Sequence, residues 1–204
     1  MKSYINFIKE STDWNKVLHD ATWTHKKQTF IPVVGERDGD SLYLMDLDKI
    51  KIAVKNGADV ECCSTLEWAV RNNNFEVVKY MLENGANVNY QNNDCKWTPL
   101  MLASDVGNVE IAKILIDYNA DPLIGNFQNI NVIDILTPAM FGYNNNVSKD
   151  IQQKRDQIYK YYIIHLINKT PMLAYKYINY LTEEEKEKYK EYIELASNIK
   201  KFNV

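Results

Sequence analysis

The residues that could carry out chemistry are few and lie far apart along the 204-residue chain. The three histidines, His19, His25 and His165, fall in different segments, and we expect surface or capping positions for them. Metal sites need His, Cys or carboxylate side chains at short spacings, and no such spacing occurs. Asp38-Gly39-Asp40 lacks the spacing and the closing glutamate of a calcium loop, so we interpret it as a turn.

The cysteines do not form a redox or nucleophilic motif either. Cys62 and Cys63 are adjacent, which makes them a poor disulfide pair, and with Cys95 they give no CxxC motif. We expect small buried or turn residues in a reducing compartment, which favours a cytoplasmic protein. Delivery into a host cell as an effector, without a cleaved signal, remains an alternative. No phosphate-binding glycine loop and no GxSxG elbow occurs, so we predict no enzyme, no cofactor and no metal.

Composition excludes two further classes of function. The net charge is -3, from 24 basic and 27 acidic residues, whereas a nucleic-acid-binding protein usually carries a basic excess. The chain lacks a continuous apolar run long enough to cross a bilayer, so we predict no membrane insertion. With 46% hydrophobic residues the chain can bury a sizeable core, and we expect a monomer.

The elements that must position any site show a repeat. Three segments have a common ending: Asn56-Gly57-Ala58-Asp59-Val60, Asn84-Gly85-Ala86-Asn87-Val88 and Tyr118-Asn119-Ala120-Asp121-Pro122. An apolar stripe with helical spacing precedes each ending. Gly57 and Gly85 lie where a helix stops and a positive φ is needed. Asn119 replaces glycine in the third copy, and asparagine is the next-best residue for this conformation.

A second helix precedes each of these stripes. Thr98 is placed as the N-cap of one such helix and Pro99 as its first residue. Leu66, Leu100 and Ile133 occupy equivalent positions in successive units, which gives a period of roughly 33 residues. Two helices and a connecting turn in a period of this length resemble the ankyrin repeat, which starts T-P-L-H-x-A. The segment 98–103 matches this start except that methionine replaces histidine.

The resemblance predicts a mainly all-α fold, a short ankyrin-repeat solenoid over residues 46–136. This region would hold a half repeat, two full repeats and the start of a degenerate fourth. We expect residues 1–45 to form an N-terminal cap, with a short helix after Asp13 and a β-hairpin or ordered loop around residues 35–40. Residues 137–204 are expected to be a helical C-terminal extension, with helices from Ser148 and Thr182. This extension caps the repeats or forms a separate interaction unit.

The connections between repeats differ in length. The segment from Val60 to Leu66 is only half as long as the equivalent segment from Val88 to Leu100. We therefore predict that the β-hairpin finger between units is absent after the first unit and long after the second, where residues 89–96 form it.

The resemblance implies a protein partner, bound through finger tips and the inner faces of first helices. Carried over position by position, the expected contact residues are Cys63, Arg71, Asn72, Asp94, Cys95, Trp97, Asp105, Val106 and Ile130. The alternative is that such positions are merely solvated, and that Trp97 packs on Tyr90 within the finger. Glu67 and Met101 replace the usual histidine, which puts its inter-repeat hydrogen bonds in doubt.

The function predicted from this resemblance is a protein–protein interaction module. A toxin-neutralising immunity protein and a secreted effector are alternatives within this class. An enzyme with its site in the terminal extensions is the competing class, which a deep polar pocket would favour.

Overall fold

The computed structural model describes residues 12–23, 45–136, 148–169 and 183–188, together with Lys190 and Glu194. Helices are the only regular elements in these ranges. Their bounds are α2 (Trp14–Thr22), α3 (Leu47–Lys55), α4 (Thr65–Arg71), α5 (Phe75–Glu83), α6 (Pro99–Asp105), α7 (Val109–Asp117), α8 (Val132–Leu136), α10 (Lys149–Lys169) and α12 (Glu183–Lys188). The predicted β-hairpin around residues 35–40 lies outside the described residues.

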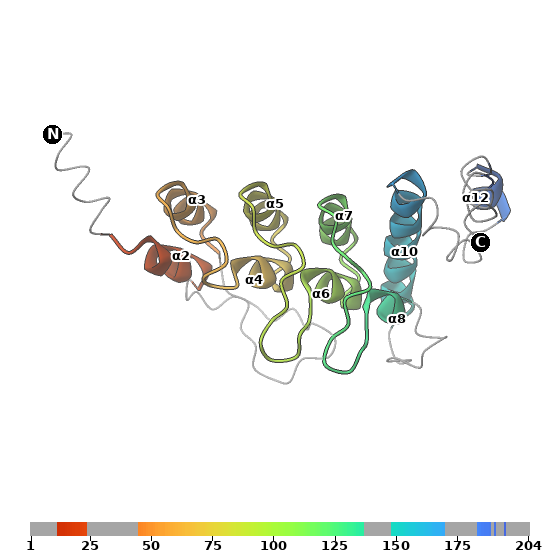
Figure 1. The fold of residues 1–204 in the computed structure, drawn as a ribbon, viewed down its shortest axis with the longest axis horizontal. Helices are drawn as coiled ribbons and strands as arrows, with labels where there is room; N and C mark the ends of the chain where they lie inside the picture. The colour runs from red at the N-terminus through yellow and green to blue at the C-terminus, as the bar shows by residue number, and fades with distance from the viewer. Residues whose placement is uncertain are drawn as a thin grey trace, which may run out of the picture.

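The helices form two parallel rows, which confirms the mainly α-helical solenoid (Figure 1). The inner row contains α2, α4, α6 and α8, and the outer row contains α3, α5 and α7. Each outer helix packs on the inner helix of its own unit, and neighbouring units pack helix on helix. The apolar stripes read from the sequence face each other here, so Val77, Met81, Ile111 and Leu115 are fully buried.

The first unit contains two helices rather than the single helix of the expected half repeat. The side chain of Asp13 caps α2 by accepting a hydrogen bond from Lys16 N at 3.1 Å, and α2 packs against α3. A hydroxyl contact of 3.0 Å between Thr22 and Thr65 joins α2 to α4. Counting back by one period missed this pairing, because residues 23–46 separate the two helices of the unit.

The predicted helix ends are confirmed by the backbone. Gly57 and Gly85 have φ angles of 99° and 88°, and Asn119 takes the same left-handed conformation at 63°. At the other end of a unit, Thr98 Oγ1 accepts a hydrogen bond from Met101 N at 3.2 Å, and Pro99 opens α6. Short polar residues and glycine thus fix where each helix starts and stops.

A chain of hydrogen bonds, here called the loop ladder, joins the loops that follow the outer helices. In each step a backbone N–H donates to a side-chain oxygen. The first acceptor lies in helix α2 of the same unit, and the other two lie in the loop of the preceding unit. The bonds are Asp59 N to Asn15 Oδ1 (2.7 Å), Asn87 N to Glu61 Oε1 (2.5 Å) and Asp121 N to Asn89 Oδ1 (2.8 Å). Leu123 takes the next acceptor position and its side chain has no acceptor atom, so within the described residues the ladder stops at Asp121.

Helix α10 closes the C-terminal end of the repeats. It begins after Ser148, as predicted, and packs against α6, α7 and α8. Arg155 is fully buried: its Nε donates to Ser104 O at 3.2 Å, and its Nη2 donates to Asp105 O and Oδ1, both at 2.7 Å. The degenerate unit keeps a short inner helix, α8, with Ile133 and Ile135 buried. None of the described helices combines the length and the apolar character that a membrane span requires.

Candidate functional site

The first finger, residues 89–97, is organised by a buried asparagine. Asn92 Oδ1 accepts hydrogen bonds from Trp97 N at 3.0 Å and Cys95 N at 3.3 Å. Its Nδ2 donates to Glu67 Oε1 of α4 at 3.0 Å. Since these bonds satisfy a side chain that is only 5% exposed, the finger is tied to the preceding repeat.

The second finger, residues 123–130, repeats this arrangement around Asn126. Its Oδ1 accepts hydrogen bonds from Gln128 N at 2.8 Å and Ile130 N at 3.0 Å. The turn closes one position sooner than in the first finger, just as Ile133 follows Leu100 one position sooner than Leu100 follows Leu66. In the described residues both fingers are turns, not the β-hairpin predicted for residues 89–96. The predicted absence of a finger after the first unit is confirmed, because residues 60–63 form a short turn.

The residues that replace the usual histidine behave differently from one another. Glu67 receives the bond from Asn92 and another from Arg71 Nε at 3.1 Å, so it does link two repeats. Met101 is fully buried in the core, and its sulfur accepts a local hydrogen bond from Thr98 N at 3.4 Å. The inter-repeat hydrogen bond that the loss of histidine put in doubt is therefore present at Glu67.

The two fingers are joined and expose an aromatic ring. Gln91 Nε2 donates to Gly125 O at 3.1 Å, and Phe127 N donates to Cys95 O at 3.4 Å. Lys96 Nζ lies 5.8 Å from the centroid of the Phe127 ring, which is 66% exposed. Asp94, Cys95, Lys96 and Phe127 are called the finger surface below.

Three predicted contact residues occupy equivalent positions, each two residues before an inner helix, α4, α6 or α8. Cys63, Trp97 and Ile130 are all partly buried and pack against the core. Tyr90, proposed as a partner for Trp97, has its hydroxyl 3.3 Å from Ser64 Oγ.

Changing Trp97 to alanine should therefore lower the free energy of unfolding by about 1–3 kcal/mol, because packing against the core is lost. Urea denaturation would measure the change. Asp94→Ala, on the exposed tip of the same finger, is the control and should unfold like the wild type. Wild-type stability of Trp97→Ala would show that the ring is available for another role.

The four remaining predicted residues lie at the other end of the inner helices. Arg71 and Asn72 end α4, and Asp105 and Val106 end α6. A seven-residue helix spans about 10 Å, which separates these ends from the fingers. Asp105 is paired with Arg155 inside the protein and is not free to meet a partner. Burial raises the pKa of Asp105 above its ordinary value, and the opposing effect of the Arg155 guanidinium only partly offsets this rise.

The Cys63 thiol is a poor nucleophile in this structure. Its sulfur lies 3.6 Å from Asn15 O, and burial, reinforced by the neighbouring Cys62, raises its pKa to about 12. A thiol with that pKa carries almost no thiolate near neutral pH. Within the described ranges no three His, Cys, Asp or Glu side chains gather to hold a metal ion.

Sequence reasoning missed the exposed aromatic residue of the finger surface, Phe127, and the two asparagines that shape the fingers. A signal was present, since Phe127 is a large apolar residue inside the polar turn Gly125-Asn126-Phe127-Gln128-Asn129. The recurrence of asparagine at positions 92 and 126, one repeat apart, was a second signal.

Comparison with known proteins identifies the repeated part of the chain. Residues 43–126 match the family described as ankyrin repeats, in three copies. A putative ankyrin repeat protein of Acanthamoeba polyphaga mimivirus is 48% identical over 62 residues, which are 30% of this chain and 38% of that protein. A palmitoyltransferase of Lachancea kluyveri is 34% identical over 98 residues, 44% of this chain and 13% of that protein.

A third relative shows how widely the repeats are distributed. A BTB/POZ domain and ankyrin repeat-containing protein of Lupinus angustifolius is 34% identical over 93 residues, 45% of this chain and 19% of that protein. The chain thus spans 13–38% of the length of these relatives. What they share with it is the repeat region.

Proposed function

We propose that this chain, whose residues 43–126 match the ankyrin-repeat family, binds a protein partner through the finger surface and the adjoining inner helices. Ankyrin repeats generally mediate protein–protein interaction. The observation that carries the proposal is Phe127, an aromatic ring 66% exposed on a finger that is hydrogen-bonded to its neighbour.

The anchoring of the fingers favours tight binding. Asn92 and Asn126 fix both turns, so little conformational entropy is lost when a partner orders them. Aromatic residues surrounded by polar groups are typical of the few positions that supply most of the energy at an interface. Asp94 and Lys96, which flank Cys95 in the first finger, would supply the polar rim.

The ends of the inner helices extend the proposed surface. Asn72, which follows α4, has a side-chain Nδ2 that is buried without a hydrogen-bond partner in the described part of the chain. Arg71, whose guanidinium lies 5.7 Å from the Trp68 ring, is beside it. Val106 belongs to the surface by position, whereas Asp105 would have to leave Arg155 in order to contribute.

The proposed role is binding without catalysis, by a monomer, in the cytoplasm. Cys62, Cys63 and Cys95 are all free thiols, in keeping with a reducing compartment. An immunity protein or an effector would act by the same kind of binding.

Replacing Phe127 with alanine should weaken the partner complex tenfold or more, since loss of an interface aromatic often costs about 2 kcal/mol. The partner would first be isolated on the immobilised wild-type protein and identified by mass spectrometry, and calorimetry would then give both affinities. The melting temperature should not change, because the ring is mostly in solvent.

Ile52→Ala is the matched control. Ile52 is 51% exposed, but it lies on the outer helix α3 away from the fingers. Equal affinities for the wild type and for Phe127→Ala would exclude the finger surface as the binding site.

A further inference from the structure

The outer helices carry a row of lysines at one repeated position. Each helix starts after a capping side chain, Asp46, Asn74 or Asn108. The fifth residue after the cap is lysine in all three, namely Lys51 in α3, Lys79 in α5 and Lys113 in α7. Figure 1 shows α3, α5 and α7 side by side and parallel, so these equivalent positions form a row along the three helices.

Two lysines of this row lie over a tyrosine of the next helix. Lys51 Nζ is 5.9 Å from the ring centroid of Tyr80, and Lys113 Nζ is 5.2 Å from that of Tyr161 in α10. Each tyrosine is also fixed by its hydroxyl, which donates to Lys51 O at 3.4 Å or to Asp117 Oδ1 at 2.8 Å. At two of the three lysine positions, the ring of a tyrosine from the following helix therefore packs against the lysine.

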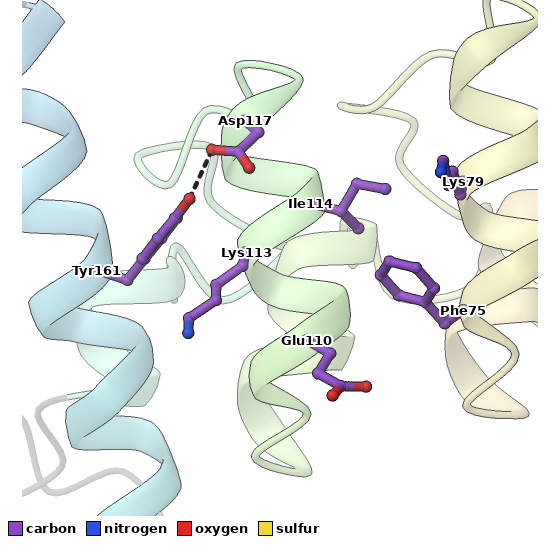
Figure 2. A pocket seen from close by; sticks show the side chains of 7 residues that line it. All are labelled: Phe75, Lys79, Glu110, Lys113, Ile114, Asp117 and Tyr161. Atoms are coloured by element: carbon purple, nitrogen blue, oxygen red, sulfur yellow. Dashed lines mark hydrogen bonds between the residues drawn. The ribbon is translucent and has the colours of Figure 1, made fainter.

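The middle lysine, Lys79, has no such ring. The helix that follows it carries Ile114 where α5 carries Tyr80. Lys79 is exposed, and within the described part of the chain it makes neither an ion pair nor a ring contact. An open hollow of about 490 Å³ runs across α7, with Phe75 and Lys79 of α5 on one side and Tyr161 of α10 on the other. On the α5 side, Figure 2 shows Phe75 and Ile114 facing each other.

We propose that this hollow accepts an aromatic side chain of a partner protein. The ring would lie between Phe75 and Ile114 and against the ammonium group of Lys79. Apolar walls bury the ring, and a cation over its face adds an attraction that the protein already uses at Tyr80 and Tyr161. The site is on the outer helices, so it is a second contact area that does not depend on the finger surface.

The charges beside the hollow favour a particular neighbour of that ring. Four charged residues line the hollow, and two of them, Lys113 and Asp117, are engaged with Tyr161. The other two, Lys79 and Glu110, are both exposed, and Figure 2 places them on opposite sides of the Phe75–Ile114 pair. Within the described ranges neither has an ion-pair partner. An aromatic residue flanked by an acidic residue on the Lys79 side and a basic residue on the Glu110 side would match this pattern.

The site can be tested with N-acetyl-L-tyrosinamide as the aromatic probe and N-acetyl-L-alaninamide as its matched control. In spectra of the ¹⁵N-labelled full chain, the tyrosine probe should produce saturable shifts at the amides of Phe75, Lys79 and Ile114, and the alanine probe should not. Shifts that do not saturate, or that map to another surface, would overturn the proposal.

Variants make the assignment sharper. Ile114→Tyr restores the repeated tyrosine, so it should weaken probe binding at least tenfold without lowering the melting temperature, while Ile114→Val should bind like the wild type. Lys79→Gln, an exposed change that leaves the fold alone, should weaken binding about threefold or more, within the range of a cation–π contact. Unchanged binding in Ile114→Tyr or Lys79→Gln contradicts the site.

Self-association of the wild type that Ile114→Tyr abolishes would make the occupant a second copy and would overturn the assignment to a partner protein.

Discussion

Replacing Arg155 with methionine should lower the free energy of unfolding by about 3–5 kcal/mol, the range found when one member of a buried ion pair is removed. Methionine keeps most of the side-chain volume but cannot donate to Ser104 O, Asp105 O or Asp105 Oδ1. The Asp105 carboxylate then stays in a poorly solvated site without its cation. Urea denaturation of the full chain would measure the loss.

The effect should depend on pH in a defined direction. Burial already raises the pKa of Asp105 above 3.8, and removal of the neighbouring cation raises it further. A raised pKa in the folded state favours the native protein at low pH, and this contribution is lost as the pH rises through that pKa. The difference between wild type and variant should therefore be largest near neutral pH and shrink as the pH falls.

Lys154→Met is the matched control for this experiment. Lys154 precedes Arg155 in α10, but its ion pair with Asp150 is exposed on both sides. Exposed pairs contribute little to stability, so this variant should unfold like the wild type. If Arg155→Met also unfolds like the wild type, the buried pair does not fasten α10 to the repeats.

Replacing Asn92 with alanine should cost about 3 kcal/mol, because several buried groups lose their partner at once. The backbone N–H groups of Cys95 and Trp97 and the carboxylate of Glu67 would all be left with fewer hydrogen bonds. Hydrogen exchange at the Trp97 amide should accelerate together with the loss of stability, since that amide depends on Asn92 Oδ1.

Asn93→Ala supplies the control for Asn92. The two asparagines are adjacent, but Asn93 is exposed, so its replacement should stay within about 0.5 kcal/mol of the wild type. Equal stability of the Asn92 and Asn93 variants would show that the finger does not need its buried anchor.

The repeats could be predicted because a packed solenoid imposes its period on the sequence. Gly57, Gly85 and Asn119 stand where the backbone needs a positive φ, and Thr98-Pro99 stands where a helix must start. The pairing of α2 with α3 could not be read in this way, because an insertion breaks the period even though the capping residue Asp13 was visible.

The details of the candidate site were harder to predict because they depend on contacts between distant residues. Asn92 lies in a run of polar residues, and only the fold shows that it is the buried one. Arg155 lies in a strongly charged segment of α10, where nothing local distinguishes it from Lys154. Asp105 was assigned to a partner by position, and its bond to Arg155 becomes visible only when α10 is packed against α6.

The loop ladder gives the array a direction of growth. The unit of α4 and α5 both donates a backbone N–H to the unit before it and supplies an acceptor to the unit after it. A duplicated unit inserted between Glu61 and Asn87 could donate its own backbone N–H to Glu61 and offer its own side-chain acceptor to Asn87 N. A unit appended beyond Leu123 would meet a leucine where it needs an oxygen. The protein can therefore be lengthened from within, but its C-terminal end acts as a terminator unless Leu123 is first changed to asparagine.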